Sequence, residues 1–210
     1  MIARRYLFVI LISAVVGLAG ALPVAADNHG KHSADFIRSL ANKAITSLTD
    51  QETLRSVRIE RFRKMFQESF AVRSIGKRAL GRYWRKATAD ERVSYQKLFE
   101  DLMVITYVDR FATYAGEALE ITKSRIEDKA IASVFSEIRR KGGAKPIRVD
   151  WIVGTNGTIY KIVDVKVEGV SMTQTLASDF SSIIRRRDGQ VAALLEELQK
   201  KTIELSAKAQ

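Results

Sequence analysis

Hydrophobic residues recur at helical spacing through the first half of the chain. The apolar positions between Phe36 and Leu48 predict an amphipathic helix. Thr49 and Glu52 match the capping-box pattern, so a second helix is expected from there to about Phe70. The early part of the sequence therefore predicts a helical subregion rather than a sheet.

The longest predicted helix belongs at the centre of the fold. A shorter helix over 75–84 precedes it, and a second capping box, Thr88 with Glu91, marks its start. It is expected to run to about Tyr114, and apolar residues occupy every side of it over 102–108. A helix that is apolar all round must be covered all round, so the other elements are expected to bury this one.

After Gly116 the hydrophobic period changes from helical to strand-like. The predicted strands cover about 119–127, 131–140, 147–153 and 159–167. Asn156 and Gly157, between the last two, are the dipeptide that type I′ hairpins favour. Four antiparallel strands with one apolar face need helices laid across that face.

Two more helices are predicted after the sheet. Gly169 ends the last strand, and Ser171 with Gln174 is a third capping-box match that starts a helix. The final helix is expected from about Gly189. Since no repeat or low-complexity linker interrupts the pattern, it predicts a single α+β domain with a helical first half and a sheet plus C-terminal helices in the second.

The first residues have the pattern of a secretory signal peptide. Arg4 and Arg5 form a positive segment, an apolar run follows, and small residues at 24–26 form the exit. The run is short for a transmembrane span, which needs about 20 residues. We therefore predict cleavage after Ala26, export from the cytoplasm, and one mature domain over 27–210.

Composition and charge narrow the classes of function. The chain has a formal net charge of +11 and no cysteine, so its stability cannot depend on disulfides. For an exported protein this charge indicates anionic lipid surfaces rather than nucleic acid. The only histidines, His29 and His32, fall in a polar stretch that we expect to be disordered. The sequence therefore predicts neither a Ser-His or Cys-His nucleophile nor a zinc site of His and Cys ligands.

Three stretches in a fixed order resemble a known family, although no single one is diagnostic. They are FAVRSIGKRALGRYW (70–84) with the helix start at 88–92, then 98–100 with Tyr107 and the helix end at 114–116, and then 160–164 with 168–171 and Phe180. Over about residues 34–205 the chain resembles the periplasmic lipid-shuttle component of the Mla phospholipid-transport pathway, also called toluene-tolerance auxiliary proteins.

The resemblance implies both a fold and a role. The fold is a cone of the nuclear-transport-factor type (NTF2-like), in which about four antiparallel strands and about six or seven helices surround an apolar cavity. Acyl chains enter the cavity and the polar head stays outside, so lipid is cargo and neither a cofactor nor a metal is expected. The implied location is the periplasm, and the implied state is a monomer. The resemblance also implies that the protein passes lipid between two membrane complexes, which supports outer-membrane lipid asymmetry. One is an inner-membrane ABC permease with its ring-forming lipid-binding subunit, and the other is an outer-membrane lipoprotein–porin complex.

A hopanoid-associated relative of that family fits the same pattern. The family often has an arginine three residues before the aromatic of the helix that follows Ser171, but here that place is Ala177, before Phe180. The sequence therefore leaves phospholipid and hopanoid open as the cargo.

A lipid carrier needs apolar walls, because each acyl methylene left in water costs about 0.8 kcal/mol. We expect the apolar sheet face and the helices opposite it to supply them, although each such residue also suits an ordinary core. The expected lipid-binding residues are Val149, Trp151, Val153, Val163, Val165 and Val167 on the sheet, Phe66, Phe70, Tyr83, Trp84, Leu102, Ile105 and Phe111 on the opposite wall, and Val170 and Met172 at the entrance.

Basic residues form two clusters that we expect to contact a membrane or a partner. The first cluster is Arg73, Lys77, Arg78, Arg82, Arg85 and Lys86, and the second is Arg185, Arg186 and Arg187. The second cluster also suits a helix C-terminus, where the helix dipole favours cations.

The alternatives to a carrier depend on other features. Asp150 and Asp164 lie on the two strands joined by the predicted hairpin and are candidates for acid–base chemistry. Asp164 equally suits a hydrogen-bonded support for a loop or a helix, and we expect no catalytic residue. An envelope interaction module without a cavity, or an NTF2-like enzyme that uses either aspartate, remains the alternative.

Overall fold

The computed structural model describes residues 24–207, so the predicted signal segment before Val24 lies outside the described residues. The helices are α1 (Val24–Leu48), α2 (Arg55–Ser69), α3 (Val72–Leu80), α4 (Tyr83–Lys86), α5 (Ala89–Ala112), α6 (Met172–Arg185) and α7 (Val191–Ala207). The strands are β1 (Ala118–Ile126), β2 (Ile131–Arg139), β3 (Ile147–Thr155), β4 (Tyr160–Val167) and β5 (Val170–Ser171), and a 3-10 turn (Lys141–Gly143) lies between β2 and β3. This arrangement confirms the predicted α+β class.

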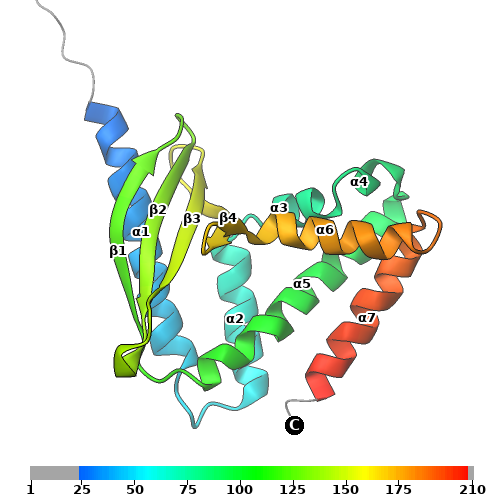
Figure 1. The fold of residues 1–210 in the computed structure, drawn as a ribbon, viewed down its shortest axis with the longest axis horizontal. Helices are drawn as coiled ribbons and strands as arrows, with labels where there is room; N and C mark the ends of the chain where they lie inside the picture. Colours follow the sequence, from blue (N-terminus) through cyan, green and yellow to red (C-terminus); the bar gives the residue numbers. More distant parts are fainter. Residues whose placement is uncertain (1–23, 208–210) are drawn as a thin grey trace, which may run out of the picture.

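The sheet and most helices occupy opposite sides of the molecule (Figure 1). The strands form an antiparallel meander in the order β1-β2-β3-β4-β5, and α1 packs across β1 and β2. Helix α2 contacts both β4 and α5, so it stands between the two sides. Helices α3, α6 and α7 gather with α5 on the side away from the sheet.

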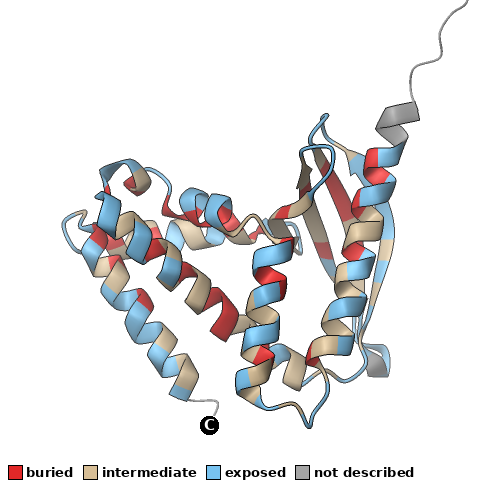
Figure 2. Ribbon diagram, turned by 180° about the vertical axis from the view of Figure 1, so that it is seen from behind, coloured by how far each residue is buried: buried red, intermediate tan, exposed pale blue. Residues whose placement is uncertain are grey.

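Each side of the molecule has its own hydrophobic core. The helical core is centred on Tyr95 and Phe99, neither of which is exposed. The sheet core joins Ile37 of α1 to buried residues of β2, β3 and β4. Phe70 packs partly against both cores, and Figure 2 shows buried residues along α5 and on the strands that α1 covers. Phe70 is therefore a point at which the two sides meet.

The central position of α5 is confirmed. Thr88 Oγ1 accepts a hydrogen bond from the backbone N–H of Glu91 at 3.1 Å, and the Glu91 carboxylate accepts one from the N–H of Thr88 at 2.8 Å. The all-round apolar part of the helix is buried at Leu102, Met103, Val104, Ile105 and Val108. The hydrophobic pattern was sufficient to predict the central position of α5, because a helix buried on every side has no polar face.

The predicted capping box at Thr49 and Glu52 is wrong. The Thr49 hydroxyl donates to the carbonyl of Ile45 at 2.7 Å, and so closes the end of α1. Asp50 accepts a hydrogen bond from the N–H of Glu52 at 3.1 Å in the loop that follows, and α2 begins only at Arg55. Short polar side chains stabilise turns as readily as helix starts, and a sequence pattern does not separate the two.

The expectation of disorder around the two histidines is also wrong. His29 and His32 lie in α1, and His29 is buried. The His29 ring centroid lies 5.8 Å from that of Tyr160 on β4, and the His32 ring centroid lies 6.2 Å from it. Contact with the sheet therefore orders a stretch whose polar composition alone suggested otherwise.

The hairpin between β3 and β4 is confirmed, but its turn is not the predicted one. Thr155 pairs with Tyr160, so the loop spans 156–159, and Gly157 has a φ of 97° whereas Asn156 has no positive φ. The Asn156 side-chain oxygen instead accepts hydrogen bonds from the N–H groups of Thr158 and Ile159. An asparagine before a glycine thus stabilises a wider loop here.

The tight turn lies one hairpin later. Glu168 and Gly169 have φ values of 50° and 82°, as the two central residues of a type I′ turn require. Val167 pairs with Val170 across this turn, which creates the short fifth strand that the sequence pattern did not predict. Ser171 then caps α6, because its hydroxyl accepts the N–H of Gln174 at 3.1 Å.

Candidate lipid-binding site

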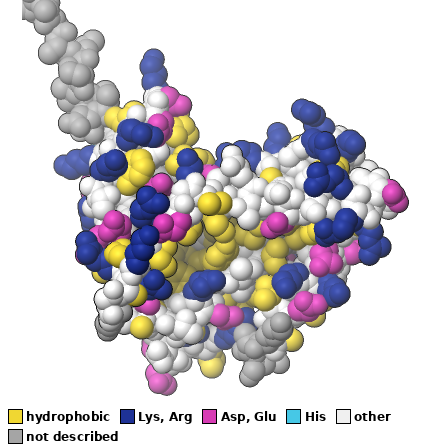
Figure 3. Space-filling view, viewed as in Figure 1, with side chains coloured by type: hydrophobic (Ala, Val, Ile, Leu, Met, Phe, Trp, Pro, Cys, Tyr) yellow, Lys and Arg dark blue, Asp and Glu magenta, His cyan; other side chains and the backbone are white. Residues whose placement is uncertain are grey.

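A hollow opens between the sheet and helices α2 and α5 on the face shown in Figure 1 (Figure 3). Hydrophobic side chains cover much of its wall, and Lys and Arg side chains stand around it. A concave, mostly apolar surface is the usual form of a small-molecule site. The hollow is therefore the candidate for the cavity that the sequence analysis expects.

Several hydrophobic side chains that pack against the two cores are only half-buried. On the sheet side they include Trp151, Val165, Leu119, Ile121 and Tyr160, and on the helical side Phe62, Phe70, Tyr107 and Leu98. Apolar surface left in water costs about 25 cal/mol per Å². A bound hydrocarbon chain would recover this free energy, so these side chains are better candidates for lipid contact than fully buried ones.

Four aromatic rings form a continuous series from α5 to the sheet. Phe111 lies 5.5 Å from Phe62, Phe62 lies 6.2 Å from Phe66, and Phe66 lies 4.8 Å from Phe70, measured between ring centroids. At its end, Phe70 forms a bridge with Ile162 of β4. Phe62 was not among the expected lipid-binding residues, although its spacing of four from Phe66 would have placed it there.

Four of the expected sheet residues lie on one face as two cross-strand pairs. Val149 is paired with Val167, and Trp151 with Val165, so their side chains lie on the same side of β3 and β4. The Trp151 indole N–H donates to Ser136 Oγ at 3.0 Å. This hydrogen bond holds the large ring in a fixed position beside the valines.

The expectation that Val163 shares this face is wrong. A β-bulge shifts the register, so that Asp164 pairs with Ile152 and Ile162 pairs with Val153. Val163 is left between them and turns to the opposite face, where a Cβ built on Gly154 would lie 3.0 Å from its Cγ1. Strict alternation along a strand fails at a bulge because one extra residue reverses every later side chain.

Val153 lies on the expected face but is closed off by the protein itself. It has no exposure and packs with Ile37, Val134 and Ile162 in the sheet core. A lipid would reach it only if α1 moved. Val153 is therefore placed as a core residue beneath the candidate site.

The helical wall contains the expected residues of α2 and α5. Phe66, Leu102 and Ile105 each retain 8% exposure, whereas Phe111 is half-buried. These side chains lie at the edge of the helical core rather than at its centre. At the proposed entrance, Val170 is 59% exposed on β5 and Met172 is half-buried at the start of α6.

Tyr83 and Trp84 do not belong to that wall. They lie on α4, at the end of α3 farther from the sheet (Figure 1). Tyr83 is buried in the helical core at 3% exposure. Trp84 is half-buried and lies between Lys77 and Arg92, at 5.9 Å and 5.6 Å from its ring centroid. The amphipathic character of these rings therefore serves a different surface.

Asp164 supports the start of α6. Its carboxylate accepts hydrogen bonds from the hydroxyls of Ser171 and Thr173 at 2.6 Å and 2.7 Å, and from the backbone N–H groups of Thr173 and Val165. Partial burial raises the pKa of Asp164, but these hydrogen bonds outweigh it and lower the pKa below its ordinary value. Asp150 does not join this network and lies opposite Lys166 in the register. Asp164 therefore serves as the hydrogen-bonded support that was one of its two expected roles.

Both basic clusters lie on the surface. The first cluster (Arg73, Lys77, Arg78, Arg82, Arg85, Lys86) is exposed along α3 and α4, and the second (Arg185, Arg186, Arg187) is exposed at the end of α6. Arg186 donates to Ser182 Oγ at 2.8 Å, within its own helix end. The second cluster therefore also satisfies the helix terminus, as the dipole argument expects.

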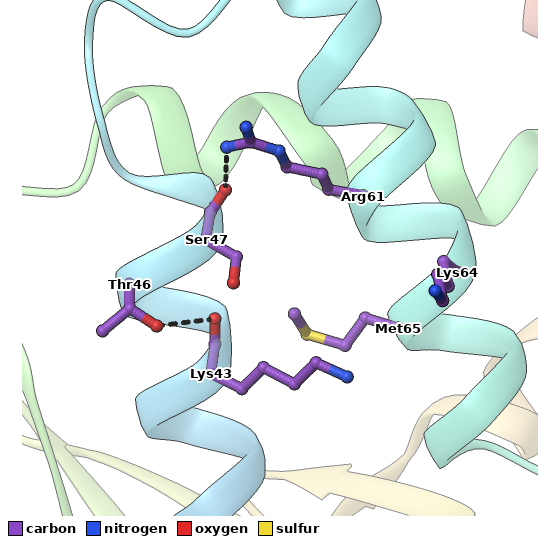
Figure 4. Close-up of a pocket in the computed structure, with 6 residues that line it drawn as sticks. All are labelled: Lys43, Thr46, Ser47, Arg61, Lys64 and Met65. Carbon is purple, nitrogen blue, oxygen red and sulfur yellow. Dashed lines mark hydrogen bonds between the residues drawn. The ribbon is translucent and has the colours of Figure 1, made fainter.

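A smaller cavity of about 340 Å³ lies between α1 and α2 (Figure 4). Its lining residues are Lys43, Thr46, Ser47, Arg61, Lys64 and Met65. Arg61 donates to the carbonyl of Ser47 at 3.1 Å across the gap, and the Met65 side chain points into it. No sequence pattern predicts this cavity, because it depends on the angle between two helices.

No three His, Cys, Asp or Glu side chains within residues 24–207 come together as a metal site would require. In the same range, none of the helices is both long enough and apolar enough to span a bilayer.

Comparison with known proteins gives matches over most of the chain. Residues 38–200 match the model of the family described as MlaC protein. The intermembrane phospholipid transport system binding protein MlaC of Haemophilus influenzae is 23% identical over 115 residues, which cover 53% of this chain and 54% of that protein. The matched segment thus spans about half the length of the curated relative.

A solved structure shares the fold. It is the phospholipid-binding protein from Ralstonia solanacearum in complex with a phospholipid, with a TM-score of 0.74 and 18% sequence identity over 83% of this chain and 98% of that one. The arrangement of α-helices around an antiparallel sheet is therefore common to both. Since the family model covers more than half of the sequence, this chain belongs to the MlaC protein family.

Proposed function

We propose that the protein binds a phospholipid with its acyl chains in the hollow between the sheet and α2 and α5, and carries it through the periplasm. The observation that supports this most directly is the apolar wall of that hollow, and the half-buried aromatic and aliphatic side chains at the edges of both cores are the proposed source of this wall. Membership of the MlaC family supports phospholipid as the ligand class.

The proposed lining joins the two sides of the molecule. On the sheet it consists of Val149, Trp151, Val165 and Val167, and on the helices of Phe62, Phe66, Phe70, Leu102, Ile105 and Phe111. Val170 and Met172 flank the entrance in this proposal. Shielding ten methylenes would contribute about 8 kcal/mol, which is enough to retain a lipid in water.

The proposed partners and location follow the family. We propose export with cleavage after Ala26 and exchange of lipid with an inner-membrane ABC permease, its ring-forming lipid-binding subunit and an outer-membrane lipoprotein–porin complex. The two exposed basic clusters are the proposed contact surfaces, since cations steer a protein toward anionic membranes and acidic partners.

The first experiment identifies the cargo. The protein is purified from its native host without detergent, extracted into organic solvent and examined by mass spectrometry. A phospholipid at close to one molecule per chain is the expected result. A hopanoid at the same ratio would replace the proposed cargo and keep the carrier, whereas recovery of no lipid would reject the carrier.

The second experiment uses the β-bulge to obtain a matched pair of variants. Val165→Trp should fill the hollow from the sheet face and reduce the retained lipid at least about tenfold, because the indole displaces acyl methylenes. Val163→Trp, two residues away on the opposite face, should retain lipid at the original ratio even if overpacking costs about 1–3 kcal/mol of stability. Circular dichroism melts would show that both variants are folded, and equal lipid loss in both would contradict the proposed lining.

A further inference from the structure

A continuous groove crosses the surface formed by α2, α3, α4 and α5. Two adjoining hollows of about 1260 Å³ and 790 Å³ share Ser74, Lys77, Trp84 and Arg92 in their linings. Their combined volume exceeds the roughly 300–1,000 Å³ of typical small-ligand pockets. The Trp84 groove, defined as the residues that line these two hollows, is therefore large enough for a segment of polypeptide.

The Trp84 groove carries cations that the protein does not neutralise. Two of its basic residues are paired, since Arg63 contacts Glu100 and Asp101 and Lys97 contacts Asp101. The other five form no ion pair with any acidic side chain that the structure describes, and they are Arg73, Lys77, Arg78, Arg85 and Arg92. Five like charges around one groove repel one another, so an anionic occupant would stabilise them.

The cations are held around an aromatic ring. Arg92 Nε donates to the carbonyl of Trp84 at 2.9 Å, and the guanidinium lies 5.6 Å from the indole centroid. Lys77 Nζ lies 5.9 Å from the same centroid. Arg78 donates to the carbonyl of Val163, which fixes it to β4. Tryptophan with arginine in a recessed position is the composition of energetic hot spots at protein interfaces.

Apolar surface is exposed in the same groove. Val93 on α5 is 72% exposed, and half-buried Phe70 lies at the inner end. Val93 belongs to neither core, and Trp84 is only half-buried where it packs against the helical core. A floor with apolar side chains and a rim of cations matches an amphipathic segment with carboxylates along its edges.

We propose that the Trp84 groove binds an acidic, amphipathic segment of a partner protein. Carboxylates of the segment would meet the five unpaired cations, and an apolar side chain would pack on Trp84 and Val93. A bilayer surface is flat on this scale, so its head groups would reach the rim without filling the recessed floor. The groove therefore fits a peptide segment better than a membrane.

The test measures binding of a defined peptide to the purified protein. The probe is a fluorescein-labelled helical peptide with glutamates on one face and leucines on the other, and its counterpart has lysine in place of each glutamate. Lys77→Glu with Arg85→Glu should weaken binding of the acidic peptide at least about tenfold, because two contacts become repulsive. The lysine peptide should not bind the original protein.

A matched control separates the groove from net charge. Lys200→Glu with Lys201→Glu makes the same change in charge on exposed positions of α7, and should alter binding by less than about twofold, since distant charges are screened at physiological salt. Equal loss in both double variants, or no binding of the acidic peptide, would overturn the proposal. The proposal would also be overturned if the protein bound phosphatidylglycerol vesicles in a way that depends on Lys77 and Arg85 but did not bind the acidic peptide.

Peptide binding in the Trp84 groove should be independent of lipid binding in the hollow. Phe70 is shared by the groove and the proposed lipid lining, but Lys77 and Arg85 are exposed and are not part of that lining, so Lys77→Glu with Arg85→Glu should retain lipid at the original ratio. Loss of peptide binding with lipid retained supports the Trp84 groove as a separate surface. Loss of lipid in that variant would contradict the separation of the two sites.

Discussion

At the residue scale, more polar side chains form hydrogen bonds that stabilise nearby turns and helix ends than sequence patterns suggest. Asp164 was a candidate for acid–base chemistry, but its carboxylate accepts four hydrogen bonds from β4, Ser171 and the first turn of α6. Thr49 looked like a helix cap but closes the preceding helix. Such roles depend on which donors lie nearby in space, and a sequence does not state that.

The first prediction concerns Asp164. Asp164→Asn should lower the free energy of unfolding by about 1.5–3 kcal/mol at pH 7, because an amide cannot accept all four charge-assisted hydrogen bonds. Urea titrations of both proteins would measure the difference.

The pH dependence of that difference has a defined sign. The pKa of Asp164 is lower in the folded protein than the ordinary value of about 3.9, so its stabilising contribution is fully present above about pH 4. That contribution is lost as the pH falls through the folded-state pKa. The gap between the original protein and Asp164→Asn should therefore narrow below pH 4, and a gap that widens there would contradict the assignment.

At the scale of elements, periodicity located the strong elements and failed at their boundaries. It placed the four long strands, the central helix and the two C-terminal helices, because each buries one continuous face or the whole cylinder. It missed β5, because that strand follows a turn in which both Glu168 and Gly169 have positive φ, and it missed the bulge at Val163, because the bulge is one extra residue in a strand. The error at Val163 moved one proposed site residue to the wrong face.

The capping box of α5 gives the second prediction. Thr88→Ala should destabilise the protein by about 1 kcal/mol, because the N–H of Glu91 loses its acceptor at the start of the central helix. Thr88→Ser keeps the hydroxyl and should cost much less. Chemical denaturation would show a lower midpoint for the alanine variant with an unchanged slope, and equal midpoints for all three proteins would show that the cap contributes nothing.

At the scale of the whole molecule, the candidate site is a product of how two separate cores are held apart. Sequence patterns could identify apolar faces. They could not show that α1 covers some apolar residues, such as Val153, while others, such as Trp151, stay partly exposed. They also placed Tyr83 and Trp84 on the wrong wall, because the position of α4 depends on the turn at Gly81, with its φ of 57°. Residue type was thus predictable, whereas the hollow itself was not.

The proposed ligand should act as a third layer between the two cores. Because the sheet side and the helical side meet at few points, among them Phe70, a lipid that contacts both would stabilise them jointly. A ligand at 100 times its Kd stabilises the folded state by about 2.7 kcal/mol. Removal of the lipid with organic solvent should therefore lower the melting temperature, and adding phospholipid back should restore it.

Hydrogen exchange would show where that stabilisation acts. Delipidated protein should lose amide protection in β3, β4 and α2, which carry the proposed lining, while the buried part of α5 should keep its protection because the helical core closes without lipid. In Val165→Trp the indole should fill the hollow. Adding phospholipid should therefore leave the amide exchange of this variant unchanged. A uniform loss of protection across the chain after delipidation would mean that the lipid supports the entire fold rather than the contact between its two sides.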